Sequence, residues 1–387
     1  MKIGFFTDTY LPAIHGITVS LKSFRKSLED LGQEVFIFAP RHRGYVDKEP
    51  NIFRFRSLRI IRKPEMFFAL PFLPVKNFRK IIKIKLDIIH SHTPFSMGFF
   101  GKGIAYYQKL PFIYTHHTQY PDYARIYTKE RFFIPRLTKH LIKRHSNISS
   151  AVIAPSRKIK KVLRGYGVKR PIYVLPTGVD LSIFKPVPQN SQFLKKKLGV
   201  SPKTKILLYV GRIAEEKNLR FLIEVFAEIM KRRKDVLLAL VGDGPYLAKL
   251  SNLVKSLNLI NNVWFIGPVV HEEIPVFYQS SDVFVFSSLT DTQGIVVSEA
   301  ISCGLPIIAL KDDVLRGMIV DGKNGFLVEK PSVFDFAGKI LKVLDNNLLY
   351  QKFSAASLEL ADYFSQKKQA ARLLDIYKTS LKLAEKK

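Results

Sequence analysis

Short apolar segments alternate with helical stretches twice along this chain, and this alternation limits the folds open to it. The first series begins with an apolar strand at 2–7 and a helical stretch at 17–31 that Gly32 ends. Further apolar strands are predicted at 34–39, 87–90, 111–116, 151–154 and 172–175. Short apolar strands separated by helices are typical of a parallel sheet covered on both faces. We therefore predict a doubly wound α/β domain.

The alternation starts again after a segment rich in proline, 176–188. Strands are then predicted at 205–210, 235–241, 262–266, 282–286 and 306–310, with helices between them, such as 218–232. A chain of 387 residues is long enough for two such domains. We place the first domain at 1–177 and the second at 178–363. Two doubly wound domains in tandem predict a ligand cleft at the carboxyl ends of their strands.

The composition of the chain limits the kinds of site and binding partner that it can have. The single cysteine, Cys303, excludes a disulfide framework and a cysteine-based metal site. No secretory signal and no stretch long enough to span a bilayer is evident in the sequence. The net charge is +30, and residues 1–177 hold 33 basic against 10 acidic side chains. Such a field attracts nucleic acid, anionic lipid headgroups or phosphorylated substrates.

A first motif, Gly211 to Asn218, lies where a predicted strand ends and a helix begins. It places Arg212 and Lys217 beside a helix start, which itself attracts anions. Two fixed cations there could hold a diphosphate and stabilise the charge that develops as a glycosidic bond breaks. A solvated turn with two surface cations is the alternative. The second strand-to-helix turn, Gly242 to Pro245, is interpreted as a tight structural loop.

A second motif joins two carboxylates. Asp291 is predicted in a loop after a strand, and Glu299 on the helix that follows, so the two carboxylates can lie at different depths of one cleft. The backbone N–H groups of Gln293, Gly294 and Ile295 would be available at the helix start for sugar hydroxyls or phosphate. The alternative is a capping Asp and an ordinary helical Glu.

Taken in order, these motifs resemble a known family. The order and spacing of five motifs resemble those of the family 4 retaining glycosyltransferases. The motifs are G-R-x-x-x-x-K-N, then G-D-G-P, then an acidic residue followed after seven residues by Glu, then G-x-P-I-I-A, and finally Asp321 to Val328. This resemblance implies the GT-B fold, with two facing Rossmann-like domains of parallel sheets. It also implies that a tail helix, 364–387, crosses back to the first domain. The first domain would bind the acceptor and the second the nucleotide sugar.

The resemblance also implies roles for single residues. Arg212 and Lys217 would hold the donor diphosphate, and Glu299 the ribose hydroxyls. The transferred hexose would contact Asp291 and the segment Thr292, Gln293, Gly294 and Ile295. The family usually has Glu in place of Asp291 and Phe in place of Gln293; the Thr-Gln-Gly version is similar to a lipid-glycosylating branch.

In the first half, Gly16 would let the donor approach the backbone closely. The family pattern T-x-H-T matches Thr115 to Thr118 and selects His117 as the residue that contacts and orients the donor sugar. Adjacent residues on a strand point opposite ways, so His116 is expected to be structural. His90 and His92 lie on one face and could in principle bind a metal, but a hydrogen-bonded strand end is favoured. No metal or other cofactor is expected.

Two basic stretches interleaved with aromatic residues, 54–85 and 125–144, lie in the presumed acceptor domain. Cations with exposed aromatic side chains describe a surface that lies on an anionic membrane. Helical faces that pack their apolar side inward are the alternative. No nucleic-acid recognition motif accompanies the charge. The membrane-binding residues are predicted to be Arg79, Lys80, Lys83, Lys139, Lys143 and Arg144.

Together these features predict a retaining hexosyltransferase. Glucose from UDP-glucose and a membrane lipid such as diacylglycerol are the expected substrates, with UDP-galactose and GDP-mannose as other donors. The enzyme is expected in the cytoplasm, peripheral on the inner face of the cell membrane. The alternatives are a soluble sugar, sugar-phosphate or polysaccharide acceptor and, from another class, a basic nucleic-acid-binding protein.

Overall fold

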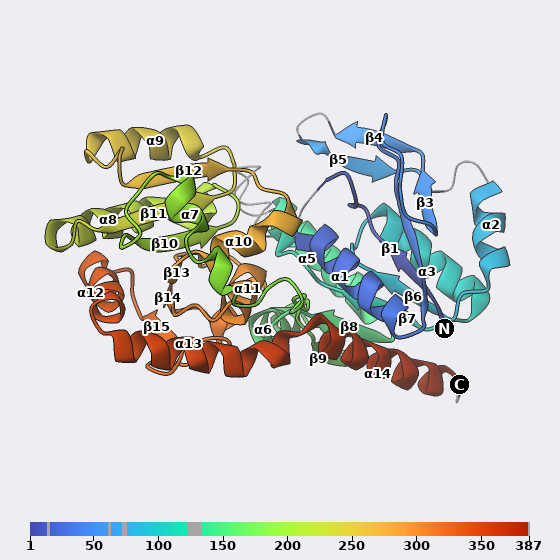
Figure 1. Cartoon of the computed structure of the whole chain (residues 1–387). Coiled ribbons are helices and arrows are strands. Elements are labelled where there is room, and N and C mark those ends of the chain that lie inside the picture. Colours follow the sequence, from blue (N-terminus) through green and yellow to red (C-terminus); the bar gives the residue numbers. More distant parts are fainter. Residues whose placement is uncertain (14–15, 61–62, 72–75, 122–132, 386–387) are drawn as a thin grey trace. The chain divides into compact units, whose positions relative to one another are not determined.

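The computed structural model describes the chain except for residues 14–15, 61–62, 72–75, 122–132 and 386–387 (Figure 1). The chain divides into two compact units. Unit 1 comprises Met1–Gly178 and Gln366–Lys387, and unit 2 is Val179–Ser365.

Unit 1 is built on a parallel sheet that, in the described part of the chain, has seven strands in the order β3-β2-β1-β6-β7-β8-β9. The strands are β1 (Lys2–Phe6), β2 (Glu34–Pro40), β3 (Ile52–Phe55), β6 (Ile88–Ser91), β7 (Phe112–Thr115), β8 (Ala151–Ala154) and β9 (Ile172–Val174). Most of their residues are buried, because helices cover both faces of the sheet.

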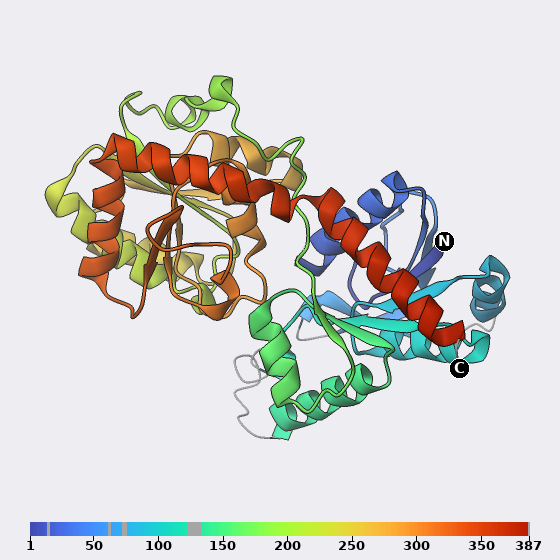
Figure 2. The same ribbon diagram turned by 90° about the horizontal axis from the view of Figure 1, so that it is seen from below.

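The helices of unit 1 are α1 (Gly16–Asp30), α2 (Lys76–Ile84), α3 (Ser96–Gln108), α5 (Phe133–Asn147), α6 (Arg157–Gly165) and α14 (Gln366–Glu385). Side chains of α1 and α14 pack together on one face of the sheet, and α14 lies beside α1 (Figure 2). The opposite face packs against α3 near β1 and against α5 and α6 near β8. The last helix of the chain therefore completes the core of the first unit.

Unit 2 has a second parallel sheet, with six strands among the described residues in the order β12-β11-β10-β13-β14-β15. The strands are β10 (Lys205–Val210), β11 (Val236–Val241), β12 (Val263–Gly267), β13 (Val283–Phe286), β14 (Ile307–Leu310) and β15 (Gly325–Val328). The expected second α/β domain is thus confirmed.

The helices of unit 2 are α7 (Phe193–Lys197), α8 (Leu219–Arg232), α9 (Leu247–Ser256), α10 (Ile274–Gln279), α11 (Ile295–Ser302), α12 (Val333–Leu344) and α13 (Asn347–Ala361). Short 3-10 turns are η1 (Pro188–Asn190), η2 (Glu215–Lys217), η3 (His271–Glu273), η4 (Asp313–Leu315) and η5 (Asp362–Phe364). Side chains from α8, α9 and α12 form the core on one face of the sheet, and side chains from α10 and α11 that on the other.

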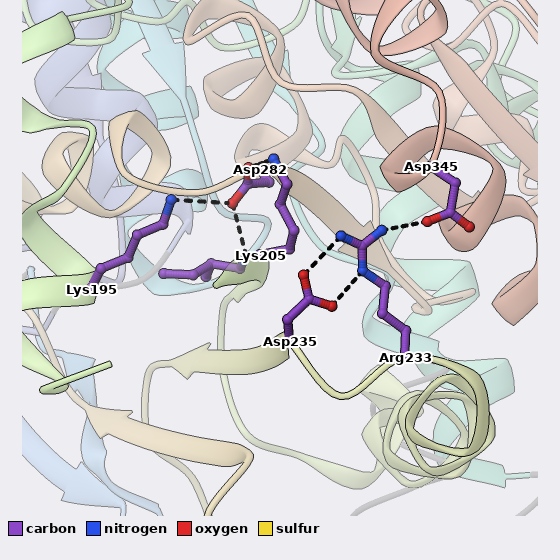
Figure 3. Close-up of polar contacts among 7 residues, drawn as sticks. Lys195, Lys205, Arg233, Asp235, Asp282 and Asp345 are labelled. Atoms are coloured by element: carbon purple, nitrogen blue, oxygen red, sulfur yellow. Dashed lines mark hydrogen bonds and ion pairs between the residues drawn. The ribbon is translucent and has the colours of Figure 1, made fainter. Parts of the chain in front are cut away.

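Ion pairs gather at the amino ends of the unit 2 strands (Figure 3). Asp282, directly before β13, accepts a hydrogen bond from the Lys205 ammonium at 3.0 Å. Arg233 binds Asp235 through two hydrogen bonds and also pairs with Asp345. These contacts lie at the edge opposite the carboxyl ends of the strands, so we assign them a structural role.

The basic stretch 54–85 differs in part from the expectation. Its first half pairs β4 (Ser57–Ile60) with β5 (Lys63–Ala69) in an antiparallel ribbon. Phe55 is buried in the core rather than exposed, because β3 is a strand of the main sheet. Arg54 is held by Asp47 at 2.6 Å, so its charge is partly neutralised. The aromatic character of this stretch therefore serves the core as well as the surface.

Other parts of the two basic stretches remain at the surface. Arg79 and Lys83 are exposed on α2, whereas the side chains of Lys80, Phe72 and Phe78 lie outside the described residues. On α5, Phe133 is 73% exposed and Leu137 56%, and the three cations expected there are also exposed, Lys139, Lys143 and Arg144. The rest of that stretch, 125–132, is likewise outside the described residues. Among the helices that the structure describes, none is long and apolar enough to cross a membrane.

Candidate functional site

The carboxyl end of β10 carries the two cations of the first motif. Gly211 has a φ of +150°, and a Cβ there would lie 2.8 Å from the Tyr209 hydroxyl, so the turn requires glycine. Arg212 follows directly with its side chain 47% exposed. Lys217 ends the short turn η2, and α8 begins two residues later. The predicted strand-to-helix loop is therefore present, with both cations on it.

The second motif lies in the loop between β13 and α11, beside the first. The Lys217 ammonium contacts Asp291 Oδ1 at 2.8 Å. Two further hydrogen bonds join the loops, from the Ser287 hydroxyl to the Lys217 carbonyl and from the Thr290 hydroxyl to the Glu216 carbonyl. The two motifs, more than 70 residues apart in the sequence, therefore form one cluster at the carboxyl edge of the sheet.

The ion pair with Lys217 uses only one of the two carboxylate oxygens of Asp291. Its second oxygen, Oδ2, is buried and has no hydrogen-bond partner among the described residues. A buried acceptor without a donor is costly unless a ligand supplies one. A sugar hydroxyl is a suitable donor, so the unpaired oxygen fits the hexose-binding role that the resemblance implies.

The start of α11 offers backbone donors next to Asp291. Gly294 is the N-cap and has a φ of +72°, the left-handed conformation that glycine adopts without strain. Because the N-cap is a glycine, it has no side-chain oxygen that could accept from these N–H groups. Ile295 is the first helical residue, and Gln293 is 6% exposed. The helix start is thus built as the second motif predicts, with N–H groups directed along the helix axis.

Glu299 lies deeper than Asp291, one turn further into α11, and is 4% exposed. Its Oε2 accepts a hydrogen bond from the Tyr278 hydroxyl at 2.8 Å. Burial raises the pKa of the Glu299 carboxyl to about 7, and the Tyr278 hydrogen bond only partly opposes this. Tyr278, on α10, was not singled out in the sequence, because an isolated tyrosine in a helical stretch carries no motif.

The Gly242 to Pro245 turn is structural, as expected. A Cβ on Gly242 would lie 2.0 Å from the Gly211 carbonyl oxygen, and one on Gly244 would lie 2.2 Å from the Ile213 carbonyl oxygen. The turn therefore packs against the Gly211 loop and supports it.

In unit 1, His117 follows β7 and contacts a second histidine. Its Nε2 lies 3.0 Å from His92 Nδ1, and the two rings stack with centroids 5.3 Å apart. Burial lowers the pKa of His117 to about 3, so the imidazole is neutral at physiological pH. A hydrogen bond between two neutral imidazoles couples their tautomers, because one of the two facing nitrogens must carry the proton and the other must accept it. His92 thus orients the residue that the family pattern selects.

The other histidines of this cluster are held inside the core. His90 is hydrogen-bonded to the Tyr377 hydroxyl at 2.6 Å and to the Thr115 hydroxyl at 2.7 Å. His116 is fully buried and bonded to the Tyr114 hydroxyl at 2.8 Å, which fits its expected structural role. No group of three or more metal-ligating side chains is found in the described part of the chain.

Gly16 is the first residue of α1, and a Cβ added there would meet nothing within 4 Å. Asp8, which the sequence reading missed, follows β1 and accepts hydrogen bonds from Thr93 and Ser96. Ser96 is the first residue of α3, and Thr93 lies in the loop before it, so Asp8 joins β1 to that helix start. Its only signal in the sequence is an acidic residue directly after a strand.

Comparison with known proteins places this geometry in a family. Residues 14–183 match the model described as Glycosyltransferase Family 4, and residues 190–359 match glycosyl transferases group 1. The chain is 35% identical to an alpha-monoglucosyldiacylglycerol synthase of Streptococcus pneumoniae, over 89% of this chain and 78% of that protein. It is 34% identical to the enzyme of the same name from Acholeplasma laidlawii, over 85% of each chain.

The fold is also that of solved glycosyltransferases. HepE of Anabaena, crystallised with UDP, superposes with a TM-score of 0.78 over 98% of this chain and 100% of its own, at 19% identity. The same protein has been solved with UDP-glucose. At this identity the likeness establishes the GT-B fold, with a Rossmann-like sheet in each unit, and confirms the fold class that the sequence predicts.

Proposed function

Because this chain belongs to glycosyltransferase family 4, we propose that it transfers glucose from UDP-glucose to a membrane lipid such as diacylglycerol. The observation that carries this proposal is the similarity to two alpha-monoglucosyldiacylglycerol synthases along most of the chain. The glucose donor is supported by their names, and the UDP moiety by the ligands of HepE.

The cluster in unit 2 supports the donor half of this proposal. A diphosphate and a hexose are covalently joined in the donor, so the groups that bind them must be neighbours. Lys217, which we assign to the diphosphate, and Asp291, which we assign to the hexose, are in direct contact. Arg212 lies on the same loop as Lys217; its side chain is 47% exposed and its guanidinium lies 3.9 Å from Glu216 Oε1. We assign it to the diphosphate as well. Glu299, deeper on α11, is assigned to the ribose hydroxyls.

In the proposed reaction the bond between the anomeric carbon and the UDP oxygen breaks, and the lipid hydroxyl oxygen bonds to that carbon from the same face. The leaving phosphate carries away the electron pair and accepts the proton of the lipid hydroxyl. Arg212 and Lys217 stabilise the charge on that phosphate, as fixed cations in a cleft do, and the proposal needs no metal. Neutral His117 orients the sugar, and the exposed helix start at Gly16 receives the donor.

We also propose that the enzyme attaches peripherally to the inner face of the cell membrane. The exposed cations Arg79 and Lys83 on α2, with Lys80, supply charge, while Phe133 and Leu137 on α5 supply apolar contact. Binding to vesicles should then increase with the anionic lipid fraction, and decrease with salt without vanishing.

The test is transfer from UDP-glucose to diacylglycerol in vesicles, with the product identified by mass spectrometry and its anomeric configuration by NMR. UDP-galactose and GDP-mannose serve as competing donors. Glucose, a sugar phosphate and an oligosaccharide serve as soluble acceptors. Transfer to a soluble acceptor but not to diacylglycerol would reject the lipid acceptor and leave the glycosyltransferase assignment intact.

A further inference from the structure

The imidazole ring of His92 is held firmly inside unit 1, directly after β6. The residue is 1% exposed, and its ring lies at 62° to the ring of Phe5, with centroids 4.6 Å apart. It also packs against His90, whose ring centroid is 4.1 Å away. His90 is itself fixed by hydrogen bonds to the Tyr377 and Thr115 hydroxyls. The His92 ring is therefore enclosed by groups that leave it little freedom to turn.

Only one nitrogen of the His92 ring has a hydrogen-bond partner among the described residues. Its Nδ1 lies 3.0 Å from His117 Nε2, whereas its Nε2 is buried and has no partner there. Burial lowers the pKa of His92 well below its ordinary value of 6.5, and the neighbouring His90 and His117 lower it further. The ring is therefore neutral and carries a single N–H, either at Nδ1 or at Nε2.

The surroundings of His92 favour the tautomer with the proton on Nδ1. In this tautomer Nδ1–H donates to His117 Nε2, and the buried Nε2 is a bare acceptor. In the other tautomer the buried Nε2 carries an N–H that needs an acceptor. Phe5 has none, and both nitrogens of His90 are already bonded. Folded proteins leave a buried N–H without an acceptor less often than they leave a buried acceptor short of a donor.

The tautomer of His92 determines that of His117. When His92 donates, His117 Nε2 accepts, so the single proton of the neutral His117 ring must be on Nδ1. His117 is partly exposed, and its Nδ1 has no hydrogen-bond partner among the described residues. An Nδ1 that carries a proton can donate a hydrogen bond to a ligand oxygen, but it cannot act as a base.

We propose that His92 is a positioning residue that holds His117 in the Nδ1–H form, so that His117 donates a hydrogen bond to an oxygen of the transferred hexose. The identity of that ligand rests on the proposed function, whereas the tautomer is a property of the chain without ligand. In this form His117 does not take the proton of the acceptor hydroxyl. That proton is therefore left to the leaving phosphate, as the proposed reaction requires.

The tautomers can be read directly by long-range ¹H–¹⁵N NMR of the full chain with ¹⁵N-labelled histidine, without any ligand. A ring nitrogen that carries a proton and a bare ring nitrogen have well-separated ¹⁵N chemical shifts. The signals of the two rings are assigned from the spectra of His117→Gln and His92→Asn. Both rings are expected in the Nδ1–H form at neutral pH. A His117 ring in the Nε2–H form would overturn the proposal.

Two variants of His92 test the positioning role. His92→Leu removes the N–H but keeps an apolar side chain in the core, so the His117 ring should become a mixture of both tautomers. His92→Asn keeps an amide N–H that can take the place of Nδ1–H, and it should restore the Nδ1–H form of His117. The control His140→Leu changes an exposed histidine of α5 and should leave the His117 signals unchanged.

The same variants are then compared in glucose transfer. His92→Leu should lower kcat by roughly tenfold, the effect of one lost hydrogen bond, with a smaller change in the KM for UDP-glucose. His92→Asn should recover most of this loss, and His140→Leu should show none. A variant that was merely unfolded would not give a folded spectrum with altered His117 signals. An altered tautomer with an unchanged kcat would overturn the contact of this N–H with the sugar.

The two readouts separate this proposal from the proposed function. The expected tautomers in a chain that transfers no glucose would support the positioning of His117 and reject the function. Normal glucose transfer with an unchanged His117 tautomer in His92→Leu would reject the positioning and leave the function in place.

Discussion

Replacing Glu299 with glutamine should stabilise unit 2, and the gain should depend on pH. In the folded chain burial raises the pKa of this carboxyl from 4.5 to about 7. A raised pKa means that the folded state binds the proton more tightly than the unfolded state. The stability that comes from this tighter proton binding is fully present below pH 4.5. It decreases as the pH rises from 4.5 to about 7, and it is lost above about 7.

The difference between the two pKa values corresponds to about 3 kcal/mol. Between about pH 5 and about pH 8, the unmodified chain should lose about 2 to 3 kcal/mol of stability that the Glu299→Gln variant keeps. The glutamine carbonyl can still accept the hydrogen bond of the Tyr278 hydroxyl, so the local packing is retained. The stabilisation is expected because a buried charge is removed and its hydrogen-bond partner is not.

Urea unfolding followed by tryptophan fluorescence measures this effect. The chain has one tryptophan, Trp264, which lies on β12 in the same unit as Glu299. The comparison is the difference in unfolding free energy between chain and variant at each pH, which cancels the titration of all other groups. Glu359→Gln is the matched control, because the Glu359 side chain is 67% exposed and should show no such pH dependence. Parallel pH profiles for chain and Glu299→Gln would refute the reasoning.

Three further variants address other features. Lys217→Ala should lower the transfer rate by roughly 10²–10³-fold in steady-state kinetics. The control Lys231→Ala, whose side chain is 69% exposed, should leave the rate unchanged. Equal transfer rates in Lys217→Ala and the unmodified chain would remove Lys217 from the donor site. Tyr377→Phe removes the hydroxyl that lies 2.6 Å from the buried His90 ring, and it should lower the free energy of unfolding in urea by about 1–3 kcal/mol. The control Tyr363→Phe, at an exposed position, should show no such loss. A loss under about half a kcal/mol in Tyr377→Phe would contradict the prediction. Gly178→Ala places a Cβ 2.2 Å from the Gln366 Cα and should lower stability by about 1–3 kcal/mol; an unchanged melting temperature would show that the backbone adapts.

The sequence predicted elements best where the apolar pattern was unbroken. The strand predicted at 205–210 matches the structure to the residue, because its apolar pattern ends at Gly211. The β4 and β5 ribbon was missed because Arg59 and Lys63 interrupt its apolar residues, so the segment reads as a basic surface. Helix α6 was missed for the same reason, since its apolar side is narrow.

The site could be predicted in part. The motifs with Arg212, Lys217, Asp291 and Glu299 follow predicted strands of the second domain. This position predicts that they lie at the carboxyl edge of one sheet, because parallel strands all end at that edge. The direct Lys217 contact with Asp291 and the hydrogen bond from Tyr278 to Glu299 depend on how separate loops pack. No sequence period encodes such contacts. The same holds for the pairing of His117 with His92, which lie just after the neighbouring strands β7 and β6.

The placement of α14 in unit 1 has a consequence for synthesis on the ribosome. Unit 2 is one continuous segment, Val179–Ser365, and it is translated between the two segments of unit 1. The sheet of unit 1 is therefore made before Leu373, Ile376 and Tyr377, which pack in its core. Until these residues are translated, the nascent sheet keeps one apolar face partly uncovered, in a state that is prone to aggregate. Unit 1 can thus complete its core only after the whole of unit 2 has been synthesised.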